Sequence, residues 1–198
     1  IEALKNIQAV VMDKTGTVTE GNFQVQKIVS TWKYSEEELL RICASCEQRS
    51  THPIAESIVR AAQEKGLKLD RPLMLKEFAG HGVSAFLPQG RVYCGNQKLL
   101  VENGIYFSQN VDEVNGSIVF VGIDGRFAGY FVISDTVKKD AKSAITHLKE
   151  MGLGTVMLTG DEKISAEAVA AEVGIDKVYS KLLPQEKLET LQKLRTEY

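Results

Sequence analysis

The strongest constraint on the fold comes from two short apolar runs that lie near opposite ends of the chain. Residues 9–12 (AVVM) and 155–158 (TVML) carry almost no polar side chain, as is typical of strands covered by helices on both faces of a sheet. The second run lies in an alternating pattern, with a helix face over 137–151, the strand itself, a helix at 164–173, a strand at 177–179 and a helix at 185–195. This β-α-β-α-β order predicts a parallel sheet that both ends of the chain build together.

The segment between the two runs has a different pattern, which indicates an inserted α+β domain. Ser35 with Glu38 is a capping-box signature, and Asp124-Gly125 is the strongest hairpin dipeptide in the chain. The predicted elements are a strand at 23–29, helices at 36–48 and 53–65, strands at 77–79, 82–87 and 91–94, a short helix at 96–102, and strands at 117–123 and 127–133. We therefore expect an α/β domain of residues 1–30 and 123–198, interrupted by an α+β domain of residues 31–122 with an antiparallel sheet.

Composition excludes several classes of protein. Charged residues make up 25% of the chain and the net charge is -2, so we expect no nucleic-acid partner. Three cysteines, Cys43, Cys46 and Cys94, cannot all pair, which favours a reducing compartment over a disulfide framework. No apolar stretch approaches the roughly 18 to 20 residues that span a bilayer, and the first residues lack a signal-peptide pattern, so we expect the chain as given to be soluble.

Polar residues that suit phosphate chemistry follow the predicted parallel strands. The ends of the strands carry Asp13-Lys14-Thr15, then Thr159-Gly160-Asp161, and later Pro184 and Lys187. In an open α/β sheet, ligands bind beyond the carboxyl ends of the strands, so these groups should meet. An aspartate there can attack phosphorus and form an acyl phosphate, while hydroxyls, backbone N–H groups, a lysine and Mg²⁺ would neutralise the phosphoryl charge. The alternative is that Asp13 only caps a turn.

The heptapeptide DKTGTVT, residues 13–19, resembles the phosphorylation motif of the P-type ATPases. The resemblance implies that Asp13 is the phosphorylated nucleophile, that Lys14 and the threonines bind phosphate, and that Asp13 and the carbonyl of Thr15 hold Mg²⁺. Thr159-Gly160-Asp161 is similar to the TGD motif of the family, and Pro184 with Lys187 is similar to its later phosphate-binding segment. Asp135 resembles the hinge aspartate between the phosphorylation and nucleotide-binding domains of the family.

Residues of the inserted segment resemble the nucleotide-binding signature of the heavy-metal branch of that family. They are Glu47, His52-Pro53, Gly80 and Gly82 of a G-x-G pair, and Gly95-Asn96. The resemblance implies that they bind ATP. The chemistry agrees, because glycines permit close backbone approach to a ligand and a histidine at a helix start can stack on or hydrogen-bond to adenine. Alone, His52 is more typical of an ordinary helix start; its order and spacing behind DKTGT favour the ATP role.

Other chemically active residues receive simpler interpretations. Asp124 is explained by the hairpin turn. Cys43 and Cys46 form a C-x-x-C on one predicted helix face without a second ligand pair, so we do not expect a metal site there. His81 and His147 are interpreted as surface residues or as residues that contact ligand-binding side chains without touching the ligand.

The resemblance implies a haloacid-dehalogenase-like phosphorylation domain, incomplete at its C-terminus, with an inserted nucleotide-binding domain. It also implies a larger pump on the cytoplasmic side of a membrane, in which transmembrane and actuator domains and a transported heavy-metal ion are the partners. The segment LLPQEKLETLQKLRTEY is more similar to the zinc/cadmium branch than to the copper branch. The chain stops before the GDGxND motif that would complete the Mg²⁺ site, so we expect an excised fragment that binds ATP but turns it over poorly. Glu162, where many relatives have asparagine, puts the contacts of that loop in question.

Two other functions fit parts of the pattern. A soluble haloacid-dehalogenase phosphatase would use the insert as a cap, but such enzymes carry a second aspartate two residues after the nucleophile, where this chain has Thr15. Without a positioned acid, an acyl phosphate should persist, as a pump requires. A nucleotide-sensing module would keep the insert and would not need Asp13.

Overall fold

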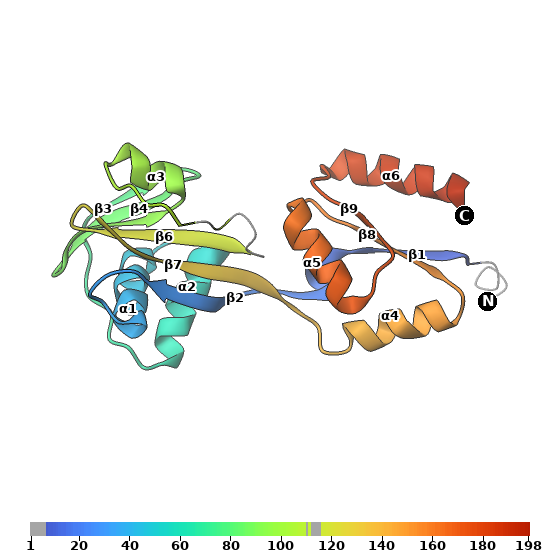
Figure 1. Ribbon diagram of the computed structural model, residues 1–198, viewed down its shortest axis with the longest axis horizontal. Helices are drawn as coiled ribbons and strands as arrows, with labels where there is room; N and C mark the ends of the chain where they lie inside the picture. The colour runs from blue at the N-terminus through green and yellow to red at the C-terminus, as the bar shows by residue number, and fades with distance from the viewer. Residues whose placement is uncertain (1–6, 110, 112–115) are drawn as a thin grey trace. The chain divides into compact units, whose positions relative to one another are not determined.

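A three-stranded parallel sheet in the order β1-β8-β9 forms the centre of one part of the chain (Figure 1). Its strands are β1 (Ala9–Asp13), β8 (Gly154–Leu158) and β9 (Lys177–Tyr179). The helices around it are α4 (Ala141–Glu150), α5 (Lys163–Val173) and α6 (Pro184–Glu197), and a single wide helical turn, η2 (Lys14–Val18), follows β1. The predicted β-α-β-α-β order and the parallel sheet are confirmed.

Both faces of this sheet are covered, as its apolar strands predict. Met12 and Met157 pack with Ala166 and Val169 of α5 and with Ile145 of α4. Neighbouring residues along the same strands point the other way, so that Val11, Val156 and Leu158 pack against Leu194 of α6. Successive side chains of a strand face opposite sides of a sheet, so strands between two helical layers are apolar throughout.

A six-stranded sheet in the order β2-β7-β6-β5-β4-β3 forms the other part. Its strands are β2 (Thr19–Ser30), β3 (Leu73–Phe78), β4 (Gly82–Leu87), β5 (Gly90–Gly95), β6 (Ser117–Ile123) and β7 (Arg126–Val137). The pairs from β3 to β7 are antiparallel. Figure 1 shows α1 (Glu36–Glu47) and α2 (Pro53–Glu64) on one face and α3 (Gln97–Glu102) on the other.

Local signals in the insert have the predicted geometry. The Ser35 hydroxyl accepts a hydrogen bond from the Glu38 N–H at 3.1 Å, and the Glu38 carboxylate accepts one from the Ser35 N–H at 2.9 Å, which confirms the capping box. Pro53 occupies the first turn of α2. Asp124 and Gly125 both have positive φ, as a two-residue hairpin turn requires, so the turn interpretation of Asp124 is confirmed.

The structure describes residues 7–109, 111 and 116–198, and the chain divides into two compact units. Unit 1 holds the residues up to Asn22 together with Asp135–Tyr198, and unit 2 is Phe23–Ser134. The predicted boundaries, 31–122 for the insert, therefore fall inside unit 2. The reason is backbone pairing, because β2 and β7 belong to the six-stranded sheet along much of their length and were predicted as shorter strands. No helix in the described part of the chain is long and apolar enough to cross a membrane.

Burial predicts a large difference between two leucine truncations in unit 2. Leu39 on α1 is fully buried, whereas Leu73 on β3 is 60% exposed. Leu39→Ala should lower the free energy of unfolding by about 2 to 5 kcal/mol, because it removes transfer energy and leaves a cavity, and Leu73→Ala should change it by about 0.5 kcal/mol or less. Trp32, the single tryptophan of the chain, lies in unit 2 and reports its urea unfolding by fluorescence. Equal effects of the two substitutions would contradict this packing.

Candidate functional site

Asp13 lies where β1 ends, beside the end of β8. Cα pairing runs from Ala9↔Gly154 to Asp13↔Leu158, so the loops that follow the two strands leave the sheet side by side. The Asp13 carboxylate accepts a hydrogen bond from the Lys14 N–H at 2.8 Å, which caps the helical turn η2. The turn-capping interpretation of Asp13 is therefore correct, but the carboxylate is also half exposed and open to a ligand.

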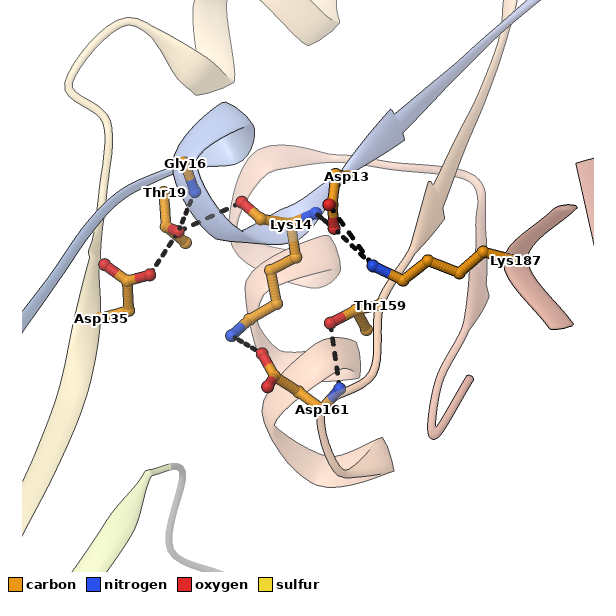
Figure 2. A network of polar contacts seen from close by, with 8 residues as sticks. All are labelled: Asp13, Lys14, Gly16, Thr19, Asp135, Thr159, Asp161 and Lys187. Carbon is orange, nitrogen blue, oxygen red and sulfur yellow. Dashed lines mark hydrogen bonds and ion pairs between the residues drawn. The ribbon is translucent and has the colours of Figure 1, made fainter. Parts of the chain in front are cut away.

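Lys187 of α6 supplies a positive charge at this carboxylate. Its Nζ lies 3.3 Å from Oδ1 and 3.4 Å from Oδ2 of Asp13 (Figure 2). The Lys187 side chain is 33% exposed and that of Asp13 is 50% exposed, so water screens this pair and its contribution to stability is small. The geometry suits a functional role better, because a lysine on both carboxylate oxygens can also contact an anion that approaches them.

Lys14 makes the second ion pair and is itself buried. Its side chain is 5% exposed, and its Nζ lies 2.6 Å from Oδ2 of Asp161. Asp161 is in turn held by its own backbone, whose N–H donates to the hydroxyl of buried Thr159 at 3.1 Å. Gly160 connects the two and is exposed. The structure therefore brings the predicted residues after β1 and β8 into one connected network (Figure 2).

Thr19 and Asp135 form a contact that the sequence analysis missed. Oγ1 of Thr19, fully buried, lies 2.6 Å from Oδ2 of Asp135 and 3.1 Å from the carbonyl of Lys14, and it accepts from the Gly16 N–H at 3.4 Å. A hydroxyl has one proton, so it donates to one of the two oxygens at a time. Asp135 is the first residue of unit 1 after unit 2, which fits the predicted position of a hinge.

Oxygen atoms near Asp13 fit part of a Mg²⁺ site. Mg²⁺ prefers six oxygen ligands, usually one or two carboxylates with water and phosphate oxygens. The half-exposed carboxylate of Asp13 and the carbonyl of exposed Thr15 are oxygen donors of the kind required. Among the described residues no group of three or more His, Cys, Asp or Glu side chains could hold a metal ion, so water and a phosphate would have to complete the coordination.

Unit 2 contains a pocket of about 290 Å³ between α1, the start of α2 and the sheet. The residues predicted to bind a nucleotide that line it are Glu47, His52, Gly80, Gly82, Gly95 and Asn96. Pro53 does not line the pocket; its role is to begin α2. Residues that the sequence analysis did not assign to it include Ser50, Glu77, Phe78, His81, Ile118 and Val119.

Two of the predicted glycines are explained by backbone packing. Gly82 and Gly95 face each other across β4 and β5. A Cβ on Gly82 would lie 2.1 Å from the Cys94 carbonyl, and a Cβ on Gly95 would lie 2.1 Å from that of His81. Both are glycine because the strands approach closely. Gly80, by contrast, has open space around its missing side chain.

The polar residues of the pocket have supporting contacts of their own. His52 caps α2, because its Nδ1 accepts a hydrogen bond from the Ile54 N–H at 3.2 Å. Asn96 caps α3 through its Oδ1, which accepts from the Leu99 N–H at 3.0 Å. Its Nδ2 lies 3.0 Å from Nδ1 of His81, which places His81 in the pocket wall. The Asn96 Nδ2 also donates to the Gly80 carbonyl at 3.3 Å, so both N–H groups of this amide have partners within the protein. The contact of His52 leaves its ring face available at the pocket.

Glu47 is buried at the end of α1 without a compensating cation. Its side chain is 6% exposed, and among the described residues it has no ion-pair partner. Burial, and then the charge of Glu77, raise the pKa of Glu47 to about 7. Near neutral pH the group therefore exists both as an acid that donates a hydrogen bond and as a carboxylate that accepts them.

The three cysteines lie together in the core of unit 2, where all are at most 1% exposed. Burial raises the pKa of the Cys43 thiol, and a hydrogen bond from Cys94 followed by burial raises that of Cys46. The proton is therefore retained, whereas a metal ligand must be a thiolate. The thiols of Cys43 and Cys46 therefore act as apolar core groups.

The sequence model of the haloacid dehalogenase-like hydrolases matches residues 7–198. The chain is 41% identical over 195 residues to the zinc-transporting ATPase of Synechocystis sp. (strain ATCC 27184 / PCC 6803 / Kazusa), and 41% identical over 195 residues to the cadmium, zinc and cobalt-transporting ATPase of Bacillus subtilis (strain 168). Each alignment covers 98% of this chain and 27% of the relative. The chain thus spans about a quarter of the length of these relatives.

A solved structure agrees with the sequence comparison. The crystal structure of a zinc-transporting PIB-type ATPase in the E2.Pi state superposes with a TM-score of 0.85 at 31% identity, over 99% of this chain and 32% of that one. The chain therefore belongs to the haloacid dehalogenase-like hydrolase family. Within it, the relatives and the solved structure described above are heavy-metal P-type ATPases, as the DKTGTVT motif predicted.

The pKa of Glu47 predicts a pH dependence of the stability of unit 2. The pKa of Glu47 is raised from 4.5 to about 7 on folding, so the contribution of its neutral form to the free energy of unfolding is fully present below pH 4.5. That contribution is lost as pH rises through about 7. The loss amounts to about 3 kcal/mol at 1.4 kcal/mol per pKa unit. Glu47→Gln should remove it, so urea unfolding followed by Trp32 fluorescence should find the variant equal to wild type near pH 4.5 and more stable at pH 8.

Glu64→Gln is the matched control for this measurement. Glu64 is exposed on α2 and does not line the pocket. Its substitution should leave the pH profile of wild type unchanged. A Glu47→Gln profile parallel to that of wild type would show that Glu47 is not held in its neutral form.

Proposed function

We propose that the chain is the ATP-binding and phosphorylation portion of a heavy-metal-transporting P-type ATPase, in which Asp13 becomes an aspartyl phosphate. The observation that carries this proposal is the network at the ends of β1 and β8. There the half-exposed carboxylate of Asp13 pairs with Lys187, and the neighbouring Lys14 is held by Asp161. The similarity to zinc- and cadmium-transporting ATPases supports it.

In unit 1, the proposed step is attack of a carboxylate oxygen of Asp13 on the γ-phosphorus of ATP. The new O–P bond forms as the bond from phosphorus to the β,γ-bridging oxygen breaks, and ADP leaves with that electron pair. Lys187, within 3.4 Å of both oxygens, reduces the repulsion between the carboxylate and the phosphoryl group. Thr159, Lys14 and Asp161 keep the two loops in register around this position.

In unit 2, the proposed role of the pocket is to bind the base and ribose of ATP. The pocket is lined by apolar groups such as Phe78, Ile118 and Val119, and no Lys or Arg is among its described lining residues. Such a lining suits an uncharged aromatic ring better than a triphosphate. His52 contributes a ring at the mouth, and Asn96 and Glu47 contribute hydrogen-bonding groups.

Mg²⁺ is the proposed cofactor. Asp13 and the carbonyl of Thr15 would hold it, and when bound it would supply positive charge to the phosphoryl oxygens. The remaining ligands would come from phosphate and water.

The wider assignments follow from the relatives. We propose zinc or cadmium as the transported ion, because the two relatives described above are named as zinc-, cadmium- and cobalt-transporting ATPases. The partners would be the transmembrane and actuator domains of the same pump, and the location would be the cytoplasmic side of the membrane. Asp135, bonded to Thr19 where the chain returns to unit 1, is the proposed hinge.

A soluble phosphatase is the less favoured function. A phosphatase of this family would place an aspartate at position 15 as an acid, and Thr15 cannot protonate a leaving group or activate water at neutral pH. Slow hydrolysis of the phosphoenzyme suits a pump, whose intermediate must last through a conformational change.

Labelling with ATP tests the proposed phosphorylation of Asp13. Incubation with Mg²⁺ and ATP labelled at the γ-phosphate should give acid-stable, hydroxylamine-sensitive label on the wild type and at least about tenfold less on Asp13→Asn, because an amide is not a nucleophile. Asp140→Asn, at an exposed aspartate of the same unit, is the control and should keep the label. Rapid release of phosphate from simple esters without label would support the phosphatase instead.

Nucleotide binding can be separated from folding at His52. Asparagine is a good helix cap, so His52→Asn should preserve α2 while it removes the ring from the pocket. Calorimetry should show a loss of ATP affinity of about tenfold, or about 1.4 kcal/mol, with an unchanged unfolding transition. His147→Asn, on α4 in unit 1, is the control. An unchanged affinity in His52→Asn would remove this residue from the site.

A further inference from the structure

His81 lines the pocket of unit 2 but has no part in the function proposed above. It ends a tight turn, in which its N–H donates to the Phe78 carbonyl at 2.9 Å and Gly80 holds the third position with a φ of 74°. Its own carbonyl accepts from the Asn96 N–H at 2.9 Å. The backbone therefore holds the partly exposed His81 at a defined place in the pocket wall.

Three contacts decide which end of the Asn96 amide faces His81. Oδ1 accepts from the Leu99 N–H at 3.0 Å, while Nδ2 donates to the Gly80 carbonyl at 3.3 Å and lies 3.0 Å from Nδ1 of His81. A flipped amide would place an N–H against the Leu99 N–H and an oxygen against the Gly80 carbonyl, so both contacts would become repulsive. The group that meets Nδ1 of His81 is therefore an N–H donor.

This amide determines the tautomer of the His81 ring. Because Nδ2 of Asn96 can only donate, Nδ1 of His81 must accept, and a neutral imidazole with a bare Nδ1 carries its proton on Nε2. In the part of the chain that the structure describes, Nε2 has no hydrogen-bond partner and is not a fully buried atom. His81 therefore has an N–H donor that is free to bind a ligand.

The other polar groups of the pocket indicate what this donor can bind. The protein uses both N–H groups of the Asn96 amide and one lone pair of its oxygen, so the amide offers a ligand only an acceptor. No Lys or Arg is among the described lining residues, so a phosphate group would meet no cation there. A neutral N–H donor in such a pocket suits an uncharged acceptor, such as a ring nitrogen of a base or an oxygen of ribose.

We propose that His81 binds the nucleotide directly, by donating its Nε2–H to an acceptor of the base or the ribose, and that Asn96 is the positioning residue that holds His81 in this tautomer. The inference rests on the proposed nucleotide-binding function of unit 2. It gives His81 a contact with the ligand, whereas the sequence analysis expected a residue that does not touch it.

Two substitutions separate the two ring nitrogens of His81. The side-chain oxygen of asparagine is bonded to Cγ, as Nδ1 of histidine is, so His81→Asn keeps an acceptor for Asn96 and removes the donor at Nε2. The amide nitrogen of glutamine lies one bond further from the backbone, near the place of Nε2, so His81→Gln restores a donor there. His147→Asn, on α4 in unit 1, is the matched control.

The measurement is calorimetric titration of the 198-residue chain with ATP at pH 8, in EDTA to prevent phosphoryl transfer. His81→Asn should bind ATP about fivefold more weakly than wild type, the effect of one hydrogen bond of about 1 kcal/mol, with an unchanged unfolding transition. His81→Gln should lie within about twofold of wild type, and His147→Asn should equal it. Equal losses in His81→Asn and His81→Gln would contradict the donor role.

Analogues of ATP that each lack one acceptor test the ligand side of the contact. They are the deaza analogues at N1, N3 and N7, the 2′- and 3′-deoxy analogues, and the carbocyclic analogue without the ring oxygen of ribose. On the analogue that lacks the acceptor of His81, His81→Asn should cause no further loss, because the hydrogen bond is already gone. An undiminished effect of His81→Asn on every analogue would overturn the contact with base or ribose.

The role of Asn96 is tested in two ways. Serine is a good helix cap, so Asn96→Ser should keep α3 while it removes Nδ2. ATP affinity should fall in Asn96→Ser, but it should fall no further when that change is added to His81→Asn. Equal losses in both backgrounds would show that Asn96 does not act through His81. Nitrogen-15 NMR of the wild-type His81 ring at pH 8 should place the proton on Nε2, and a proton on Nδ1 would overturn the tautomer.

The outcomes separate this inference from the function on which it rests. An ATP affinity that His81→Asn leaves unchanged would overturn the contact of His81 and leave nucleotide binding intact. Absence of ATP binding by the folded wild type would overturn the nucleotide-binding function itself, and the inference with it.

Discussion

The parallel pairing of β1 with β8 is the interaction on which the candidate phosphorylation site depends. It joins Ala9–Asp13 to Gly154–Leu158, segments separated by the whole of unit 2. Closing so long a loop costs conformational entropy, although that cost grows slowly with loop length. Burial on both faces of the sheet, by α4 and α5 on one side and α6 on the other, offsets it. The insert is compatible with this closure because the chain leaves along β2 and returns along β7, two neighbouring strands of one sheet.

The candidate sites of the two units differ in their charged side chains. Unit 1 places two lysines and two aspartates in ion pairs, and only Lys14, which pairs with the partly exposed Asp161, is closed to solvent. Desolvation of the lysine opposes the attraction and water screens the carboxylate, so the pair adds little net stability, but it fixes the loops in one arrangement. Lys187 and Asp13 stay accessible, as a site for an incoming anion requires. Unit 2 has no lysine or arginine among the described residues of its pocket, and its buried carboxyl, Glu47, has no ion-pair partner among the described residues.

Much of both sites could be predicted from short segments, because their chemistry is local. The turn after β1 and the cap at Ser35 depend on residues within five positions of one another. The contact between Thr19 and Asp135, by contrast, spans 116 positions and follows from how β2 and β7 run together. Glu77 and His81 reach the pocket wall through the register of β3 and β4, which no local pattern specifies. Gly82 and Gly95 could be identified from the sequence. The reason that they are glycines, the close approach of two strands, could not be predicted from it.

The sequence alone determined the order of the elements, the parallel sheet with its insert, and the residue types that follow each strand, because periodicity and turn chemistry act over a few residues. Only the tertiary structure decided the boundaries of the units, which depend on how far β2 and β7 run as neighbouring strands of the six-stranded sheet. It also decided that Lys14 pairs with Asp161 while Lys187 pairs with Asp13, and that Glu47 is buried in a pocket that Glu77 also lines. Distances and desolvation between segments remote in sequence set these pairings and protonation states, and they exist only once the chain is folded.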